Sequence, residues 1–250
     1  MPRGKGRGRG RGWGRPRARK QVERNEDDID IGKLPRDHTK EFAKIVCAFL
    51  RDLSHTFVYK YGGYEPDEFH EETAFKEHTV MVCEDEELIE YIETTLRSVN
   101  RWLEYQKLEG FAVALVNNNE TVAYSYQINF FKPEVKVKKK IADFLVYITD
   151  LRKKFFEILN KIRYSKRPAD ADDRSLHFRI LCKLIPETTI AHRPSEYAWE
   201  KVENMTETSD SLLLPLGTRI DNPIVQADMY GKHCKATKEE EAEYSEDDSD

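Results

Sequence analysis

Residues 88–99 read Leu88-Ile89-Glu90-Tyr91-Ile92-Glu93-Thr94-Thr95-Leu96-Arg97-Ser98-Val99 and have the spacing of an amphipathic helix. The apolar residues that would form its buried face are Leu88, Ile92, Leu96, Val99 and Leu103. Four acidic residues, 84–87, come directly before this face, where the helix dipole favours negative charge. The pattern predicts a helix whose N-terminus lies at these acidic residues and which packs one side on a core.

A strand–turn–strand pattern follows this helix. Residues 110–116 form a mostly apolar run of strand length, and residues 121–128 alternate polar and apolar side chains. Between them, Asn117-Asn118-Asn119-Glu120 supplies the side chains that favour turns. The run from Gly110 to Ile128 therefore predicts a β-hairpin.

Further elements are predicted before this unit. A helix should begin near Asp37 or Thr39, both of which can cap its first turn, and end at Tyr61-Gly62-Gly63. Its apolar stripe is Phe42, Ile45, Val46, Phe49, Leu53 and Phe57. Residues 79–83 then have the composition of a short strand.

A third helix is predicted after Pro133. Its apolar residues cover nearly two sides, which is typical of a helix sandwiched between other elements: Ile141, Phe144, Leu145, Ile148, Leu151, Phe155, Ile158, Leu159 and Ile162. A strand over residues 176–185 follows and ends at Pro186. Two shorter strand-like pieces, residues 212–214 and 224–230, come later.

Charge divides the 250-residue chain into three parts, although its net charge is only −5. Residues 1–36 are a basic, Gly/Arg-rich tail with an acidic spacer, and residues 231–250 are an acidic tail. Neither has the apolar content that offsets the entropy of ordering, so we expect both to be disordered. One folded domain is expected over residues 37–230.

Four scattered cysteines, Cys47, Cys83, Cys182 and Cys234, form no Cys-x-x-Cys pair. There is no signal sequence and no apolar run long enough to cross a membrane. We expect a reduced intracellular protein without membrane contact, in which the cysteines are structural. Cys182 illustrates this role, because it falls in the apolar phase of the strand predicted over residues 176–185.

No catalytic motif, phosphate loop or metal-ligand spacing is present, which argues against an enzyme and predicts no cofactor. His233-Cys234 lacks a second ligand pair and is interpreted as exposed tail sequence rather than a metal site. His70 and His78 lie among glutamates and are interpreted as part of a solvated acidic loop.

The N-terminal tail holds nine Lys or Arg and no acidic residue within residues 1–20. Its cations, including Arg7, Arg9 and Arg11, could contact nucleic-acid phosphates, with Trp13 stacking on a base. Equally, it could be a flexible tail, in which residues 15–20 serve as a nuclear import signal. Both interpretations stay open, and both favour a nuclear location.

The order of predicted elements, with the spacing Leu88, Tyr91, Ile92, Thr95 and Leu96, resembles the HORMA family. The corner Tyr64-Glu65-Pro66-Asp67-Glu68-Phe69 keeps the family's Tyr-to-Phe spacing but shifts its proline by one residue. The match is closest to the Rev-seven type (Mad-two-B), the accessory subunit of DNA polymerase zeta. It departs in the loop His70 to Ala74, where relatives carry basic residues.

This resemblance implies an α+β fold: a mainly antiparallel sheet with a β-hairpin, packed on three helices. It also implies a C-terminal safety belt over about residues 186–230, which closes over a partner peptide. Tyr91 and Trp199 match positions that contact the partner in the Rev-seven type. Tyr91 could alternatively be a core tyrosine, whereas Trp199 lies in a polar, aperiodic stretch, and tryptophan is enriched among interface hot spots.

The function implied is a non-enzymatic adaptor in translesion synthesis or DNA repair, which captures a peptide of the polymerase zeta catalytic subunit or of another repair or checkpoint protein. Two alternatives are a HORMA protein of the spindle checkpoint or meiotic chromosome axis, and an RNA-binding protein that acts through its Gly/Arg-rich tail. By family analogy, a HORMA-remodelling ATPase and a homo- or heterodimer with another HORMA domain are further candidate partners.

Overall fold

The computed structural model describes residues 28–29, 36–62, 64–74, 78–118, 121–131, 137–138, 143–165, 176–186, 211–215, 219–222 and 224–234. The helices are α1 (Arg36–Tyr61), α2 (Glu86–Glu104) and α3 (Asp143–Tyr164), with the short 3-10 helix η2 (Pro66–Glu68). The strands are β1 (Asp28–Ile29), β2 (Phe69–Ala74), β3 (His78–Cys83), β4 (Leu108–Val116), β5 (Val122–Phe131), β6 (Val137–Lys138), β7 (His177–Leu184), β8 (Ser211–Pro215), β9 (Ile220–Asp221) and β10 (Gln226–Cys234).

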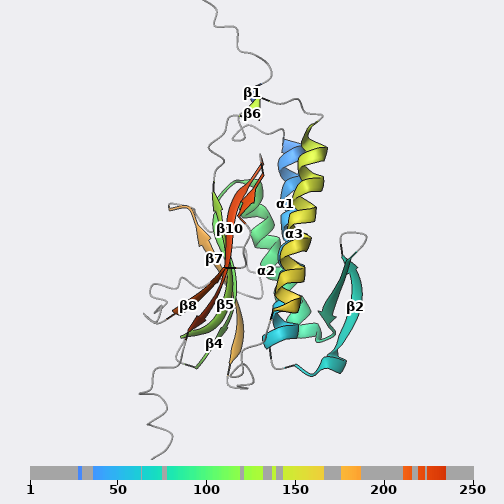
Figure 1. The fold of residues 1–250 in the computed structure, drawn as a ribbon, viewed down its shortest axis with the longest axis vertical. Helices are drawn as coiled ribbons and strands as arrows, with labels where there is room; N and C mark the ends of the chain where they lie inside the picture. Colours follow the sequence, from blue (N-terminus) through green and yellow to red (C-terminus); the bar gives the residue numbers. More distant parts are fainter. Residues whose placement is uncertain are drawn as a thin grey trace, which may run out of the picture.

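The main sheet is antiparallel and has the order β7-β4-β5-β10-β8, with the short β9 also paired to β10 (Figure 1). Its centre is the predicted hairpin: β4 and β5 pair from Gly110 opposite Asn129 to Val116 opposite Val122. Residues from the C-terminal part of the chain extend the sheet on both sides of this hairpin. β7 adds beside β4, and β10 adds beside β5.

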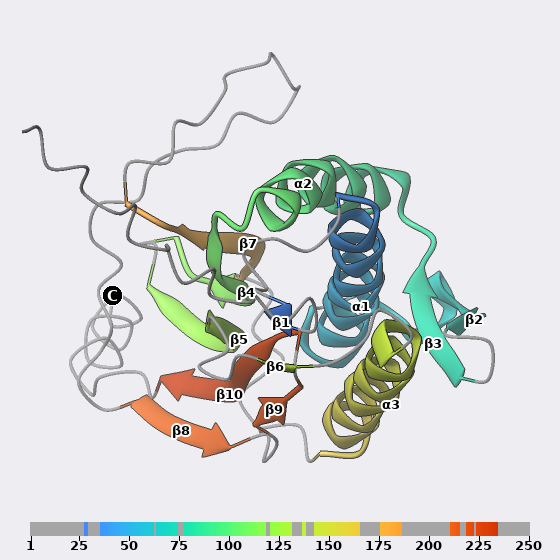
Figure 2. The same ribbon diagram turned by 90° about the horizontal axis from the view of Figure 1, so that it is seen from above.

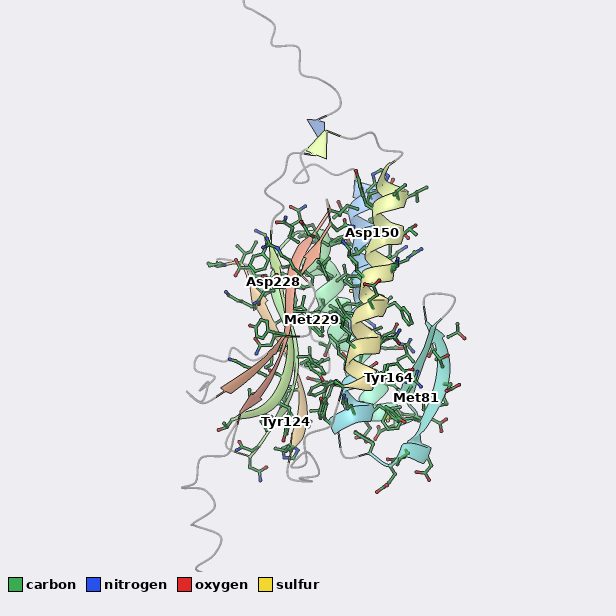
Figure 3. All side chains as sticks on the ribbon, viewed as in Figure 1. Met81, Tyr124, Asp150, Tyr164, Asp228 and Met229 are labelled. Carbon is green, nitrogen blue, oxygen red and sulfur yellow. The ribbon has the colours of Figure 1, made fainter. Side chains whose placement is uncertain are left out.

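The three helices form a layer on one face of the sheet. Seen from above, α1 lies between the sheet and the separate hairpin of β2 and β3 (Figure 2). The α2 helix begins where predicted, because the Asp85 carboxylate accepts a hydrogen bond from the backbone N–H of Leu88 at 3.0 Å. The residues predicted for its buried face are buried. Figure 3 shows Met229 of β10 on the side of the sheet toward the helices and Asp228 on the outer side.

The core lies between this sheet face and the helices. Phe49 of α1 and Phe155 of α3 stack with ring centroids 4.0 Å apart, and both are almost fully buried. Phe57 of α1 meets the ring of Tyr126 of β5 edge-on at 5.4 Å. Lys60 ties the ends of two helices together, because its ammonium group donates to the Ile162 carbonyl at the end of α3, at 2.6 Å. The α1 helix therefore packs against both the α3 helix and the main sheet.

Residues 69–74 form strand β2 and not a loop, which corrects the prediction for His70 to Ala74. The segment pairs with β3 along its length, from Phe69 opposite Cys83 to Ala74 opposite His78. The Arg51 guanidinium on α1 holds β2 with two hydrogen bonds to the Glu72 carboxylate, at 3.0 and 2.7 Å. Composition alone did not predict this strand, because it contains glutamates and carboxylate side chains are depleted in strands.

The prediction that α3 is buried on two sides is wrong at the start of the helix. Leu145 and Val146 are 72% and 64% exposed, whereas Ile148, Leu151 and Phe155 are buried. Only one face of α3, whose buried residues are three or four positions apart, contacts α1 and the core.

The first two helices, the hairpin and the later strands are where the sequence predicts them, except that β10 continues to Cys234. His233-Cys234 therefore belongs to a strand and not to a tail.

Candidate functional site

Strand β7 is an edge of the main sheet. It pairs with β4 from Val116 opposite His177 to Leu108 opposite Leu184, and no other strand within the described ranges pairs with it. An edge strand presents a row of backbone N–H and C=O groups that another strand can bind. The C-terminal strands do not cover this edge, because β10 and β8 lie beyond β5 on the opposite side of the sheet (Figure 1).

Two backbone hydrogen bonds show which residues of β7 face outward. The N–H of Ile185 donates to the Lys107 carbonyl, at 2.9 Å, on the β4 side. The N–H of Ile180 instead donates to the Tyr91 hydroxyl, at 3.0 Å, on the other side. In an antiparallel ladder the N–H and C=O of one residue point the same way, and the direction alternates along the strand. The outward-facing backbone groups are therefore those of residues 178, 180, 182 and 184.

Tyr91 connects α2 with this edge. It lies on the partly buried side of α2, and its ring meets the ring of Phe178 edge-on, with centroids 6.0 Å apart. The ring centroid of Phe178 in turn lies 6.2 Å from that of Phe57 in the core. The Tyr91 ring thus packs beside core residues, and its hydroxyl accepts a backbone donor of the sheet edge. Its contact with a partner peptide remains a prediction.

The surroundings of Tyr91 keep its hydroxyl protonated. Burial raises its pKa above the ordinary value, while the hydrogen bond from the Ile180 backbone and the positive charge of Arg179 oppose the rise. Nearby, burial raises the pKa of the Cys47 thiol to about 12 and also raises that of Cys182. Both thiols are therefore poor nucleophiles, in keeping with the structural role predicted for them.

The two faces of β7 differ in chemistry. Phe178, Ile180 and Cys182 point toward the helices and pack on the core. Arg179 and Lys183 lie on the outer face and are exposed. Lys183 lies 3.5 Å from the Glu109 carboxylate of β4, but the ion pairs found within the described residues do not include Arg179.

The sequence predicts Tyr91 as a site residue and predicts a strand over residues 176–185, which the structure confirms as β7. The role of this strand in the site was missed, although its alternation of apolar residues with Arg179 and Lys183 carries a usable signal. Trp199 lies outside the described residues, as do Arg7, Arg9, Arg11 and Trp13. The predicted contacts of these side chains remain predictions.

Two titratable side chains of α1, Asp52 and His55, are buried at a distance from this edge in the sequence. Asp52 and His55 are almost fully buried, and the His55 imidazole accepts a hydrogen bond from the Cys83 N–H at 3.4 Å. Burial raises the pKa of Asp52 to about 7, against the effect of Arg51, and lowers the pKa of His55 to about 4. These groups join α1 to β3.

No group of three metal-ligating side chains occurs among the residues that the structure describes. His70 has one acidic partner, the Glu84 carboxylate at 3.3 Å, and both side chains are largely exposed. Within the same residues, no helix is both long enough and apolar enough to cross a membrane.

Comparison with family models gives no match, and comparison with curated proteins gives no significant one. Solved structures do match. A chain in the crystal structure of a mitotic checkpoint complex has a TM-score of 0.58 at 13% identity, over 79% of this chain and 97% of that one. C. elegans HTP-2 bound to a HIM-3 closure motif has a TM-score of 0.57 at 10% identity, over 79% and 91%. HTP-2 bound to HTP-3 closure motif 1 has a TM-score of 0.57 at 9% identity, over 85% and 96%. Identities this low show the fold alone, and on that ground the chain has the α+β fold of HORMA domains.

Proposed function

We propose that this protein is a non-enzymatic adaptor that captures an extended partner segment as an added strand on β7. One observation carries the proposal: no strand of the described residues pairs with the outer edge of β7, while the C-terminal strands β10 and β8 occupy the far side of the sheet. The matched HTP-2 structures each hold a closure motif, which supports the same mode of action for this fold.

Strand addition explains how such a site gains affinity without a deep pocket. Main-chain hydrogen bonds to residues 178, 180, 182 and 184 hold the segment, and side-chain contacts on alternate positions select it. The chain after Pro186, including Trp199, is proposed to close over the segment as a belt. A belt that must open before release makes dissociation slow, and most differences in affinity between related complexes lie in the dissociation rate.

Tyr91 has a defined place in this proposal. Its hydroxyl accepts the Ile180 N–H at 3.0 Å, so an incoming strand has to replace this bond with one of its own. Its ring, against Phe178, then lies beside the added strand. Tyr91 thus protects the edge before capture and contacts the partner after it.

The partner is proposed to be a peptide of the polymerase zeta catalytic subunit or of another DNA-repair protein, bound in the nucleus. The support for this pathway is the Rev-seven-like pattern around Leu88, Tyr91 and Thr95. A spindle-checkpoint or meiotic-axis role is the second candidate, favoured by the likeness to a chain of a mitotic checkpoint complex. A HORMA-remodelling ATPase and a second HORMA domain are additional proposed partners.

Affinity purification with mass spectrometry on the full chain tests the pathway, because repair, checkpoint and axis proteins are separable by identity. Pull-down with the recovered peptide then tests the site. Tyr91→Ala and Trp199→Ala should each weaken capture, whereas Tyr105→Ala at the end of α2 should not, since Tyr105 is 68% exposed. Equal binding by all three variants would remove both residues from the site.

The Gly/Arg-rich tail is tested separately, because it is proposed to contact nucleic acid rather than the peptide. Removing residues 1–20 should abolish binding to single-stranded RNA or DNA and leave peptide capture unchanged. Loss of both activities would point to the tail as the main functional element, and the RNA-binding alternative would then replace the adaptor proposal.

A further inference from the structure

The outer face of β7 carries positive charges that would favour some partner strands over others. Residues 177, 179, 181 and 183 point away from the helices, because residues 178, 180 and 182 point toward them. Of the outer set, Arg179 and Lys183 are cations four residues apart, on the same face of the strand. An added strand would place its own outer side chains about 5 Å from theirs, since directly opposite Cβ atoms are that close.

The charges around these cations do not cancel them. Glu109 lies 3.5 Å from Lys183, and both side chains are partly or largely exposed, which makes the pair weak. Arg179 makes no ion pair with the carboxylates of the described residues. Its positive charge reaches the edge itself, because it opposes the rise in the pKa of Tyr91. An acidic side chain on the added strand would therefore meet a cation that has no competing carboxylate among the described residues.

On the side of β7 that faces the helices, the surroundings favour apolar side chains of an added strand instead of acidic ones. The ring of Phe178 and the side chains of Ile180 and Cys182 pack on the core, and the Tyr91 ring closes this side from α2. Burial already raises the pKa of Tyr91 and Cys182, so a charged side chain placed here would lose its hydration. Apolar side chains fit this row.

We infer that β7 selects a segment of a partner protein in which apolar side chains, facing α2, alternate with acidic side chains, facing Arg179 and Lys183. This inference rests on the proposed capture function and adds the chemical class of the partner. The alternation holds for either direction of the added strand, because the side-chain period of a strand is two residues.

A displayed library of random twelve-residue peptides, selected on the full-length chain, tests the inference. The wild type should enrich peptides with Asp or Glu at every second position and apolar residues between them. The double variant Arg179→Glu, Lys183→Glu should instead enrich Lys or Arg at those positions. It should bind the best acidic peptide about tenfold more weakly at low salt, since two exposed attractions become repulsions.

Lys153→Glu is the matched control, because Lys153 is an exposed cation on α3, on the other side of α1 from β7 (Figure 2). It should select the same peptides as the wild type. The inference would be overturned if the wild type enriched peptides without the acidic alternation, or if the double variant bound the best acidic peptide as tightly as the wild type does. Either result would leave the capture proposal intact. A library that yields no binder would overturn strand capture itself.

A synthetic peptide of this chain's own residues 24–33 supplies a further arm, since Asp28-Ile29-Asp30-Ile31 has the same alternation. The structure pairs Asp28 and Ile29 with β6 and not with β7. We expect this peptide to bind more weakly than the best library peptide. If it bound as tightly and competed with it, the occupant would be a second copy of this chain instead of a partner protein.

Discussion

The hydroxyl of Tyr91 on α2 lies 3.0 Å from the backbone nitrogen of Ile180 on β7 and accepts its hydrogen bond. The two residues are 89 positions apart, and their contact joins a helix to β7, the edge strand of the main sheet as the described residues form it. A helix side chain thus occupies a donor that would otherwise pair with another strand.

Tyr91→Phe tests this relationship directly. The variant keeps the ring against Phe178 but loses the acceptor for the Ile180 N–H, so hydrogen exchange at Ile180 should become faster. Its free energy of unfolding should fall by about 1 kcal/mol or less, because the freed N–H can bind water. Amide exchange followed by NMR measures both. Tyr105→Phe is the control, and unchanged exchange at Ile180 would show that the bond does not protect the edge.

Proline scanning of β7 tests the assignment of inner and outer backbone groups. Cys182→Pro removes an N–H that faces outward, so the pairing with β4 should survive and peptide capture should be lost. Leu181→Pro removes an N–H on the side that pairs with β4, and should lower stability more than Cys182→Pro does, because it interrupts this pairing. Thermal unfolding and peptide binding of the two variants separate these effects. The reverse order of stabilities would mean that the alternation along β7 is the opposite.

Phe49→Ala tests the packing of α1 against α3. Phe49 is fully buried and stacks on Phe155 at 4.0 Å, so its removal leaves a cavity that should cost about 3–5 kcal/mol. Leu145→Ala on α3 should change stability by about 0.5 kcal/mol or less, since Leu145 is 72% exposed. Urea unfolding measures both. Similar costs for the two variants would contradict the one-sided burial of α3.

Asp52→Asn should change how stability depends on pH. Burial raises the pKa of Asp52 from 3.8 to about 7, so the folded state binds the proton more tightly than the unfolded state. Its contribution to the free energy of unfolding therefore decreases as the pH rises from about 4 to about 7, and is constant above that. The variant cannot lose a proton there, and should gain stability relative to the wild type across this window, on the order of a few kcal/mol.

Urea unfolding of both proteins at several pH values measures this difference. The buried His55, whose pKa is lowered to about 4, acts in the opposite direction, because acid favours its protonation in the unfolded state. Since both proteins contain His55, its effect largely cancels in the comparison. A stability difference that does not vary with pH would show that Asp52 is not a buried carboxyl.

Glu72→Gln tests what holds the β2–β3 hairpin to α1. The Glu72 carboxylate accepts two hydrogen bonds from Arg51, which hold the pKa of Glu72 below its ordinary value. Loss of the charge should speed amide exchange in residues 69–74 and cost about 1 kcal/mol or less, because both side chains are partly exposed. Glu71→Gln, an exposed neighbour, should leave exchange unchanged. Equal effects of the two variants would contradict the role of this pair.

Much of the fold could be predicted because its elements carry local signals. The stripe of α2, its acidic first turn and the asparagine-rich turn between β4 and β5 follow from side-chain period and turn chemistry. Strand β2 was missed because His70, Glu71 and Glu72 look like a solvated loop. It exists because β3 pairs with it as a hairpin and because Arg51 of α1 binds the Glu72 carboxylate. The second contact joins residues 21 positions apart, so composition within the segment does not show it.

The sequence alone determined the three helices, the central hairpin and the strand after the third helix, and that Tyr91 lies on a helix before a hairpin. Only the tertiary structure decided which edge of the sheet has no partner strand among the described residues. That outcome depends on β7 pairing with β4 while β10 pairs with β5, and strands with alternating side chains can pair with either edge. The burial of one sheet face against the three helices selects the register of β7. This register places Ile180 beside Tyr91 on the helix side and leaves Arg179 on the outer face.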